Sequence, residues 1–109
     1  MRQAEVFCND IRAGIITEEQ PGRNYTFTYD PAYLADADHD PVSVTMPLRE
    51  EPYRSTFLFP FFTNMLPEGA NRKVVCRYWR LDEADFFGLL LKIATFDTIG
   101  AVTVKEITQ

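Results

Sequence analysis

The run FFGLLLKI, from Phe86 to Ile93, constrains the fold more than any other stretch, because it has almost no polar face. A helix that is apolar on nearly every side has to be buried among other elements. Asp82 comes before this run and is the expected N-cap, with Glu83 and Asp85 in the first turn. The pattern therefore predicts a buried helix at the centre of the domain.

The N-terminal third of the chain has the pattern of strands joined by tight turns. Short apolar segments flank Asn9-Asp10, two residues that tolerate the positive φ of a hairpin turn, and Pro21-Gly22 marks the next turn. In YTFTYD, aromatic residues alternate with threonine, which is typical of a half-buried strand. The buried face of this strand is expected to carry Tyr25, Phe27 and Tyr29.

The middle of the chain predicts shorter elements. AYLAD suits one helical turn, and VSVTMPL alternates as a strand should, with Val42, Val44 and Met46 on one face. REEPYRST is polar and turn-like. In FLFPFFTNML, a short helix is expected from about Pro60 to Met65, because proline suits a first helical turn. At the C-terminal end, GAVTVKEI predicts a last strand.

A further helix is expected to begin near Glu68, because Pro67 keeps Leu66 out of the helical conformation. Its apolar residues recur at helical spacing and predict a core-facing side that includes the tryptophan: Val74, Val75, Tyr78 and Trp79. Its cations indicate a solvated flank: Lys73, Arg77 and Arg80.

The elements come as strands, then helices, then one last strand, an order typical of an α+β domain. We expect one domain over residues 1–109. It should contain a small, mainly antiparallel sheet of about five strands, starting with the N-terminal hairpin and covered by about two or three helices.

Charge and composition exclude several classes of function. A net charge of −5 disfavours direct nucleic-acid binding, which needs cations to displace phosphate counterions. No apolar run approaches the ~20 residues of a membrane span, and the N-terminus lacks an apolar signal core, so a cytoplasmic protein is expected. Cys8 and Cys76 are far apart and outside any CxxC pair, which predicts two reduced, packed thiols.

The sequence contains no pattern that supports catalysis. It has no GxGxxG or GxxxxGK[ST] loop, and no serine in a nucleophile-elbow setting. The acidic loop with Asp36, Asp38, Asp40 and His39 lacks the length and the distant glutamate of a calcium loop, so a solvated loop is expected. We therefore expect no catalytic residue, no metal and no cofactor. The enzyme alternative would have to use Glu68 and His39.

Four stretches together resemble the N-terminal subdomain 1 of HipA-type serine/threonine kinases: YTFTYDPAYLA, SVTMPL, FFTNMLPEG and DFFGLLLKIATFDTIGAVTV. They stand in the order of that family and at compatible spacings, from about Val6 to Ile107. The front hairpin of the family typically carries Asn-Gly, where this chain has Asn9-Asp10. The resemblance implies the fold of that subdomain.

In HipA-like toxins a much larger kinase body follows this subdomain and holds the catalytic residues, whereas this sequence ends at Gln109. It is similar in this to the HipS antitoxins of HipBST toxin–antitoxin systems, whose kinase toxin, HipT, lacks the subdomain. The resemblance implies a non-enzymatic antitoxin that binds and inhibits a HipT-like kinase, with a HipB-like helix-turn-helix protein in the same complex. A non-inhibitory scaffolding or activating subunit is the alternative, and a DNA-binding antitoxin is a further one.

The same resemblance implies that the corner between the short helix ending near Met65 and the helix beginning near Glu68 docks at the active-site cleft of the kinase. The expected contact residues are Met65, Leu66, Pro67, Glu68, Gly69, Ala70, Asn71 and Arg72. Proline and glycine would fix the shape of the corner, so that little ordering entropy is lost on docking. The family often has a bulky residue after Glu-Gly, where a tryptophan can enter the cleft. Here that position is Ala70, which shifts the expected contact to Met65, Leu66 or the Asn71-Arg72 pair.

Overall fold

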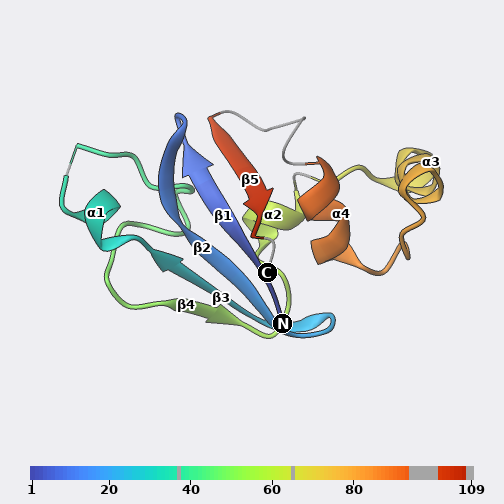
Figure 1. Cartoon of the computed structure of the whole chain (residues 1–109), viewed down its shortest axis with the longest axis horizontal. Helices are drawn as coiled ribbons and strands as arrows, with labels where there is room; N and C mark the ends of the chain where they lie inside the picture. Colours follow the sequence, from blue (N-terminus) through green and yellow to red (C-terminus); the bar gives the residue numbers. More distant parts are fainter. Residues whose placement is uncertain (37, 65, 94–100, 108–109) are drawn as a thin grey trace.

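The computed structural model describes residues 1–36, 38–64, 66–93 and 101–107. Its elements follow the chain as β1 (Arg2–Cys8), β2 (Ile11–Gln20), β3 (Arg23–Tyr29), α1 (Pro31–Leu34), β4 (Tyr53–Ser55), α2 (Pro60–Thr63), α3 (Gly69–Trp79), α4 (Phe86–Ile93) and β5 (Val102–Glu106). The strands form one sheet in the order β4-β3-β2-β1-β5, and all neighbours are antiparallel (Figure 1). The predicted α+β class with a five-stranded antiparallel sheet is confirmed.

Both predicted hairpin turns are present. Asn9 and Asp10 adopt φ values of 53° and 65°, as a two-residue turn with two left-handed residues requires. β1 and β2 pair on either side of them. In the next hairpin, Gly22 has φ 76° and Gln20 pairs with Arg23. These turns join β1, β2 and β3 into a continuous meander.

One face of the sheet forms the core. Tyr25, Phe27 and Tyr29 are buried side by side on β3, as the alternation predicts. The apolar side of α4, together with α2, packs into the same cluster, with Phe62, Phe87 and Leu90 fully buried. The predicted buried helix is therefore present. α3 lies beyond α4, away from the sheet (Figure 1).

The strand predicted over VSVTMPL is wrong. Val42 and Met46 are buried, but Val44 is 94% exposed at the tip of a turn in which the Met46 N–H donates to the Ser43 carbonyl over 3.0 Å. The Ser43 hydroxyl accepts the Thr45 N–H at 3.2 Å. A serine that bonds its neighbouring backbone competes with strand pairing, and here it wins.

Tyrosine hydroxyls take the place of a partner strand along this loop. Tyr29 donates to the Met46 carbonyl and accepts the Val42 N–H at 3.1 Å. Tyr33 donates to the Asp40 carbonyl at 2.5 Å, and Tyr53 donates to the Pro47 carbonyl at 2.6 Å. The backbone of the loop is therefore held by side chains that a local sequence pattern does not reveal.

Other strand and helix limits also differ from the predictions, and the helix expected from about Pro60 to Met65 ends at Thr63. Tyr53–Ser55, expected to be a turn, forms β4 because it pairs with β3 from Tyr25 to Phe27. The N-cap of α4 is Asp85 rather than Asp82: the Asp85 Oδ1 accepts the Gly88 N–H at 3.1 Å. Asp82 instead accepts the Ala84 N–H at 2.9 Å, ahead of the helix.

Candidate functional site

The corner between α2 and α3 is anchored at one end and exposed at the other. Leu66 is buried at 5% exposure and packs in the core. Glu68 takes the N-cap position of α3 in an extended conformation, and its side chain makes no capping hydrogen bond. Gly69 follows with φ 58°, a left-handed conformation that favours glycine. The chain therefore turns sharply out of the core and into α3.

Arg72 braces this corner from the first turn of α3. Its Nε donates to the Pro67 carbonyl at 2.9 Å, and its guanidinium lies 5.1 Å from the centre of the Phe86 ring. A cation above an aromatic face adds a modest electrostatic attraction. Arg72 thus ties the backbone before α3 to the start of α4 and holds the corner in one shape.

The eight expected contact residues divide into groups. Met65 lies outside the described residues. Leu66 belongs to the core and Arg72 is a half-buried brace, so neither presents a free surface, and the contact expected of Leu66 stays a prediction. Pro67 is half-buried. The exposed tip consists of Glu68, Gly69, Ala70 and Asn71.

α3 carries large exposed apolar side chains, and the prediction of a core-facing tryptophan side is wrong. Only Cys76 of α3 is buried, with Val75 half-buried. Val74 is 64% exposed, Tyr78 78% and Trp79 40%. Helical spacing groups these residues within one arc of α3. Because both sides of α3 hold apolar residues, spacing alone could not tell which side packs against the rest of the domain.

The aromatic segment that leads into α2 and continues through it is only partly core. Phe59 and Phe62 are buried and Phe61 is half-buried, but Phe57 is 74% exposed.

Cys8 and Cys76 are free, buried thiols, as predicted. Burial raises the pKa of the Cys76 thiol, which makes it a poor nucleophile.

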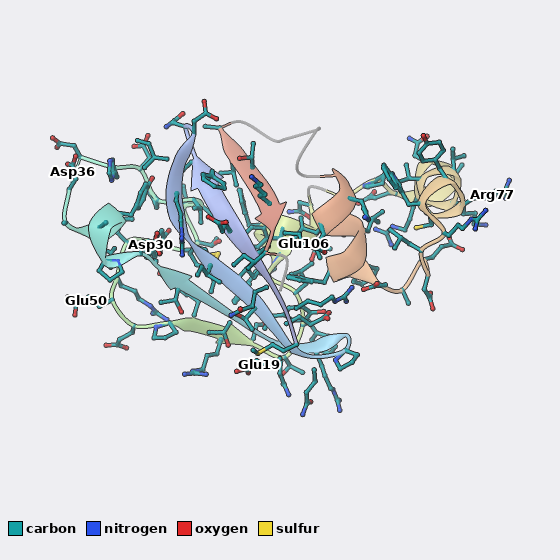
Figure 2. All side chains as sticks on the ribbon, viewed as in Figure 1. Glu19, Asp30, Asp36, Glu50, Arg77 and Glu106 are labelled. Carbon is teal, nitrogen blue, oxygen red and sulfur yellow. The ribbon has the colours of Figure 1, made fainter. Side chains whose placement is uncertain are left out.

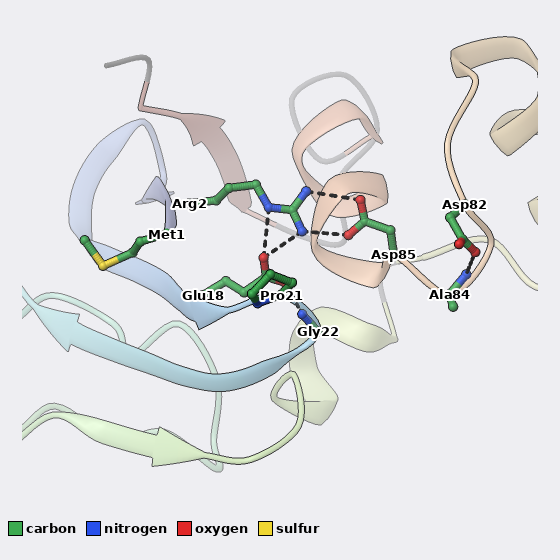
Figure 3. Close-up of a pocket in the computed structure, with 8 residues that line it drawn as sticks. All are labelled: Met1, Arg2, Glu18, Pro21, Gly22, Asp82, Ala84 and Asp85. Atoms are coloured by element: carbon green, nitrogen blue, oxygen red, sulfur yellow. Dashed lines mark hydrogen bonds and ion pairs between the residues drawn. The ribbon is translucent and has the colours of Figure 1, made fainter.

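A surface hollow of about 550 Å³ lies at the N-terminal end of α4, and it contains an ion-pair cluster that the sequence did not reveal (Figure 3). Arg2 donates from Nε and Nη2 to Glu18 Oε1 at 2.9 and 2.7 Å, and from Nη1 and Nη2 to Asp85 at 3.1 and 2.7 Å. The second Glu18 oxygen accepts the Tyr25 hydroxyl at 3.0 Å.

This cluster is structural in its geometry. The hydrogen bonds from Arg2 hold the pKa of Asp85 below its usual range, and the two carboxylates hold the pKa of Arg2 above its own. The pKa of Tyr25 is raised mainly by burial. Every polar group of the cluster faces a partner within it, so the cluster joins β1, β2 and α4 and leaves no group poised for acid–base chemistry.

The residues of the enzyme alternative are not brought together. His39 stacks on Tyr33 with ring centres 4.3 Å apart, and its Nε2 lies 3.6 Å from Asp36. Glu68 lies at the exposed corner. Within residues 1–36, 38–64, 66–93 and 101–107, no three histidine, cysteine or carboxylate side chains are grouped so that they could hold a metal ion. Among the same residues no helix is long and apolar enough to cross a membrane.

Comparison with known proteins places these features in context. The family model described as HipA N-terminal domain matches residues 4–105. The solved structure of the N-terminal domain of HipA toxin superimposes with a TM-score of 0.72 and 25% identity, over 100% of this chain and 95% of that one.

Two relatives differ greatly in length. An uncharacterized protein of Haemophilus influenzae is 31% identical over 109 residues, which are 100% of this chain and 96% of that protein. The Sinorhizobium fredii protein Y4mE, a kinase by name, is 33% identical over 102 residues, 94% of this chain but 24% of that protein. The same unit thus makes up nearly all of one relative and about a quarter of the other.

Proposed function

This chain belongs to the HipA N-terminal domain family, and we propose that it acts there as a non-catalytic antitoxin that binds and inhibits a HipT-like serine/threonine kinase. The observation that carries the proposal is the difference in length between its relatives. The unit is the N-terminal domain of a HipA toxin and a quarter of a protein named as a kinase, yet it is also nearly the whole of the Haemophilus influenzae protein. A unit that occurs both within and apart from such a protein can act on a kinase in trans.

The corner between α2 and α3 supplies a surface suited to that role. Its tip, Glu68 to Asn71, is exposed, while Leu66 is fixed in the core and Arg72 holds the Pro67 carbonyl. A surface that is already rigid loses little conformational entropy on docking. Binding of this tip in or beside the active-site cleft would keep the kinase from closing on its substrates, by occlusion or by restraint of the two lobes.

A HipB-like helix-turn-helix protein is the proposed third component of the complex. The net charge of −5 supports a division of labour in which that protein, and not this chain, contacts operator DNA. The described ion pairs and hydrogen bonds form a scaffold rather than a reaction centre, which supports a binding role over an enzymatic one.

The test is a binding and activity assay with a HipT-like kinase, which is to be sought among the genes beside the one for this chain. The wild-type chain is expected to co-elute with the kinase and to suppress its autophosphorylation. Glu68→Lys should weaken the complex at least about tenfold, as expected for a reversed charge at an interface. Glu50→Lys is the matched control and should bind normally, because Glu50 is also an exposed carboxylate and lies on the loop at the opposite end of the molecule (Figure 2).

Two results would count against the proposal. If a complex forms but the kinase keeps its full activity, the chain is a scaffolding subunit and the inhibitory role is wrong. If no complex forms, or no such kinase is encoded nearby, the assignment to a kinase partner is wrong.

A further inference from the structure

One face of α3 is exposed along the helix and continues directly from the corner. At about 100° per residue, six residues fall within an arc of about 160°. We call them the outer face of α3: Ala70, Asn71, Lys73, Val74, Arg77 and Tyr78. All six are exposed, whereas the opposite side carries the buried Cys76 and the half-buried Arg72 and Val75. The outer face extends for about 12 Å along the helix axis.

The outer face combines apolar and aromatic groups that water solvates poorly. Val74 and Tyr78 are one helical turn apart and are 64% and 78% exposed. The Tyr78 ring meets the half-exposed Trp79 edge to face, with centres 5.2 Å apart. Single exposed apolar side chains are common, but tyrosine and arginine are among the types that dominate binding energy at protein interfaces, and Tyr78 and Arg77 both belong to the outer face.

The outer face is also cationic on an acidic protein. The segment from Gly69 to Arg80 holds four cations and no carboxylate, while the chain as a whole has a net charge of −5, so the remainder carries −9. Among the described residues, neither Lys73 nor Arg77 has an ion-pair partner. Arg77 points away from the rest of the molecule (Figure 2). A surface that covers this face has to be acidic to be complementary.

We propose that the outer face of α3 is the second part of the kinase-docking surface and that it contacts an acidic patch on the kinase. The inference rests on the proposed function and adds the place and the chemistry of the contact. The exposed tip of the corner has only four residues, Glu68 to Asn71, whereas a stable interface takes about 20 residues or more from each partner. The outer face adjoins this tip, and its charge selects the partner surface.

The experiment measures association and dissociation rates with a cognate HipT-like kinase at low and high salt. Arg77→Glu should slow association at least about tenfold at low salt, and the difference should shrink at high salt, because long-range attraction is screened. Tyr78→Ala should raise the dissociation rate at least about tenfold, since it removes a central aromatic contact. Circular dichroism should show both variants folded, because neither side chain is buried.

Matched controls come from the same chain. Arg54→Glu, the control for Arg77→Glu, reverses an exposed charge on β4. Val44→Ser removes an exposed valine from the loop turn and is the control for Val74→Ser, which removes one from the outer face of α3. Arg54→Glu and Val44→Ser should stay within about twofold of the wild-type rates, because rim or remote contacts contribute little binding energy.

Three outcomes would overturn the inference. If the α3 variants bind like the controls while Glu68→Lys still weakens binding, the outer face takes no part and the proposed function stands. If the wild-type chain does not bind the kinase, both proposals fail together. If Arg77→Glu leaves kinase binding intact but removes binding to duplex DNA from the chain's own promoter region, the outer face is a nucleic-acid surface.

Discussion

Replacement of Arg2 by methionine should test how strongly the ion-pair cluster holds the fold together. Arg2 makes four hydrogen bonds to two carboxylates, one of which, Glu18, is only 3% exposed in its side chain. Removing one partner of a fully buried ion pair costs about 3–5 kcal/mol, because the other charge is left without compensation. The Arg2 side chain is itself 38% exposed, so water compensates part of the loss. We expect a loss of about 2–3 kcal/mol.

Arg12→Met is the matched control. Arg12 also lies between two carboxylates, with its guanidinium 3.6 Å from Glu5 and 3.0 Å from Asp30, but all three side chains are substantially solvated. An exposed pair of this kind contributes about 0–1 kcal/mol. The two variants thus differ in the burial of Glu18 and in the four hydrogen bonds of Arg2, and not in the number of carboxylates. Urea unfolding at neutral pH measures both free energies of unfolding.

The effect of Arg2→Met should also depend on pH. The pKa of Asp85 is lowered in the folded chain, so the folded state binds fewer protons than the unfolded state when the pH falls below the ordinary value of 3.8. The stabilisation from the Arg2–Asp85 pair is complete above that pH and is lost as the pH falls towards the lowered pKa. The difference in stability between wild type and Arg2→Met should therefore shrink as the pH falls below 3.8 towards the lowered pKa of Asp85. An Arg2→Met variant no less stable than Arg12→Met at pH 7 would refute the structural role of the cluster.

Three further variants test individual contacts. Tyr29→Phe should cost about 1–3 kcal/mol, measured by urea unfolding, because the Val42 N–H and the Met46 carbonyl lose their partner; wild-type stability would show that the hydroxyl does not hold the loop. Leu66→Asp should destabilise the chain by more than about 3 kcal/mol, whereas Ala70→Asp should change the melting temperature little; equal melting would place Leu66 on the surface. Arg80→Gly should stabilise by about 1 kcal/mol, because Arg80 ends α3 with φ 57°; a lower melting temperature would contradict this.

Local patterns were sufficient for the elements that depend on neighbouring residues. The turn at Asn9-Asp10 and the alternation of Tyr25, Phe27 and Tyr29 specify the hairpins and the face of β3 by themselves, and the structure confirms them. The apolar run of α4 likewise forced its burial.

Contacts between distant residues were not predictable. The sequence from Val42 to Met46 has the alternation of a strand. In the structure, the hydroxyl of Tyr29, 17 residues from Met46, binds the backbone groups that a partner strand would bind. Asp85 caps α4 and also binds Arg2, 83 residues away. No short window of sequence contains such pairs.

The resemblance indicated where the candidate site lies, but it did not indicate which of its residues are buried and which are exposed. The sequence around Pro67 fixes the backbone direction of the corner, yet it does not say that Leu66 points into the core and that Glu68 to Asn71 point outward. The exposure of Val74 and Tyr78 depends on which side of α3 meets Phe86, which is a tertiary contact through Arg72. Helical spacing could suggest the outer face of α3 but could not distinguish it from the buried one.

The most direct test of the antitoxin role is a titration of a cognate HipT-like kinase with the purified wild-type chain, in which the kinase's rate of ATP turnover is measured. If the chain is a tight-binding inhibitor, the turnover should fall in proportion to the amount added and reach its minimum at one chain per kinase. A rate that stays constant or rises while the two proteins co-elute would contradict the central claim.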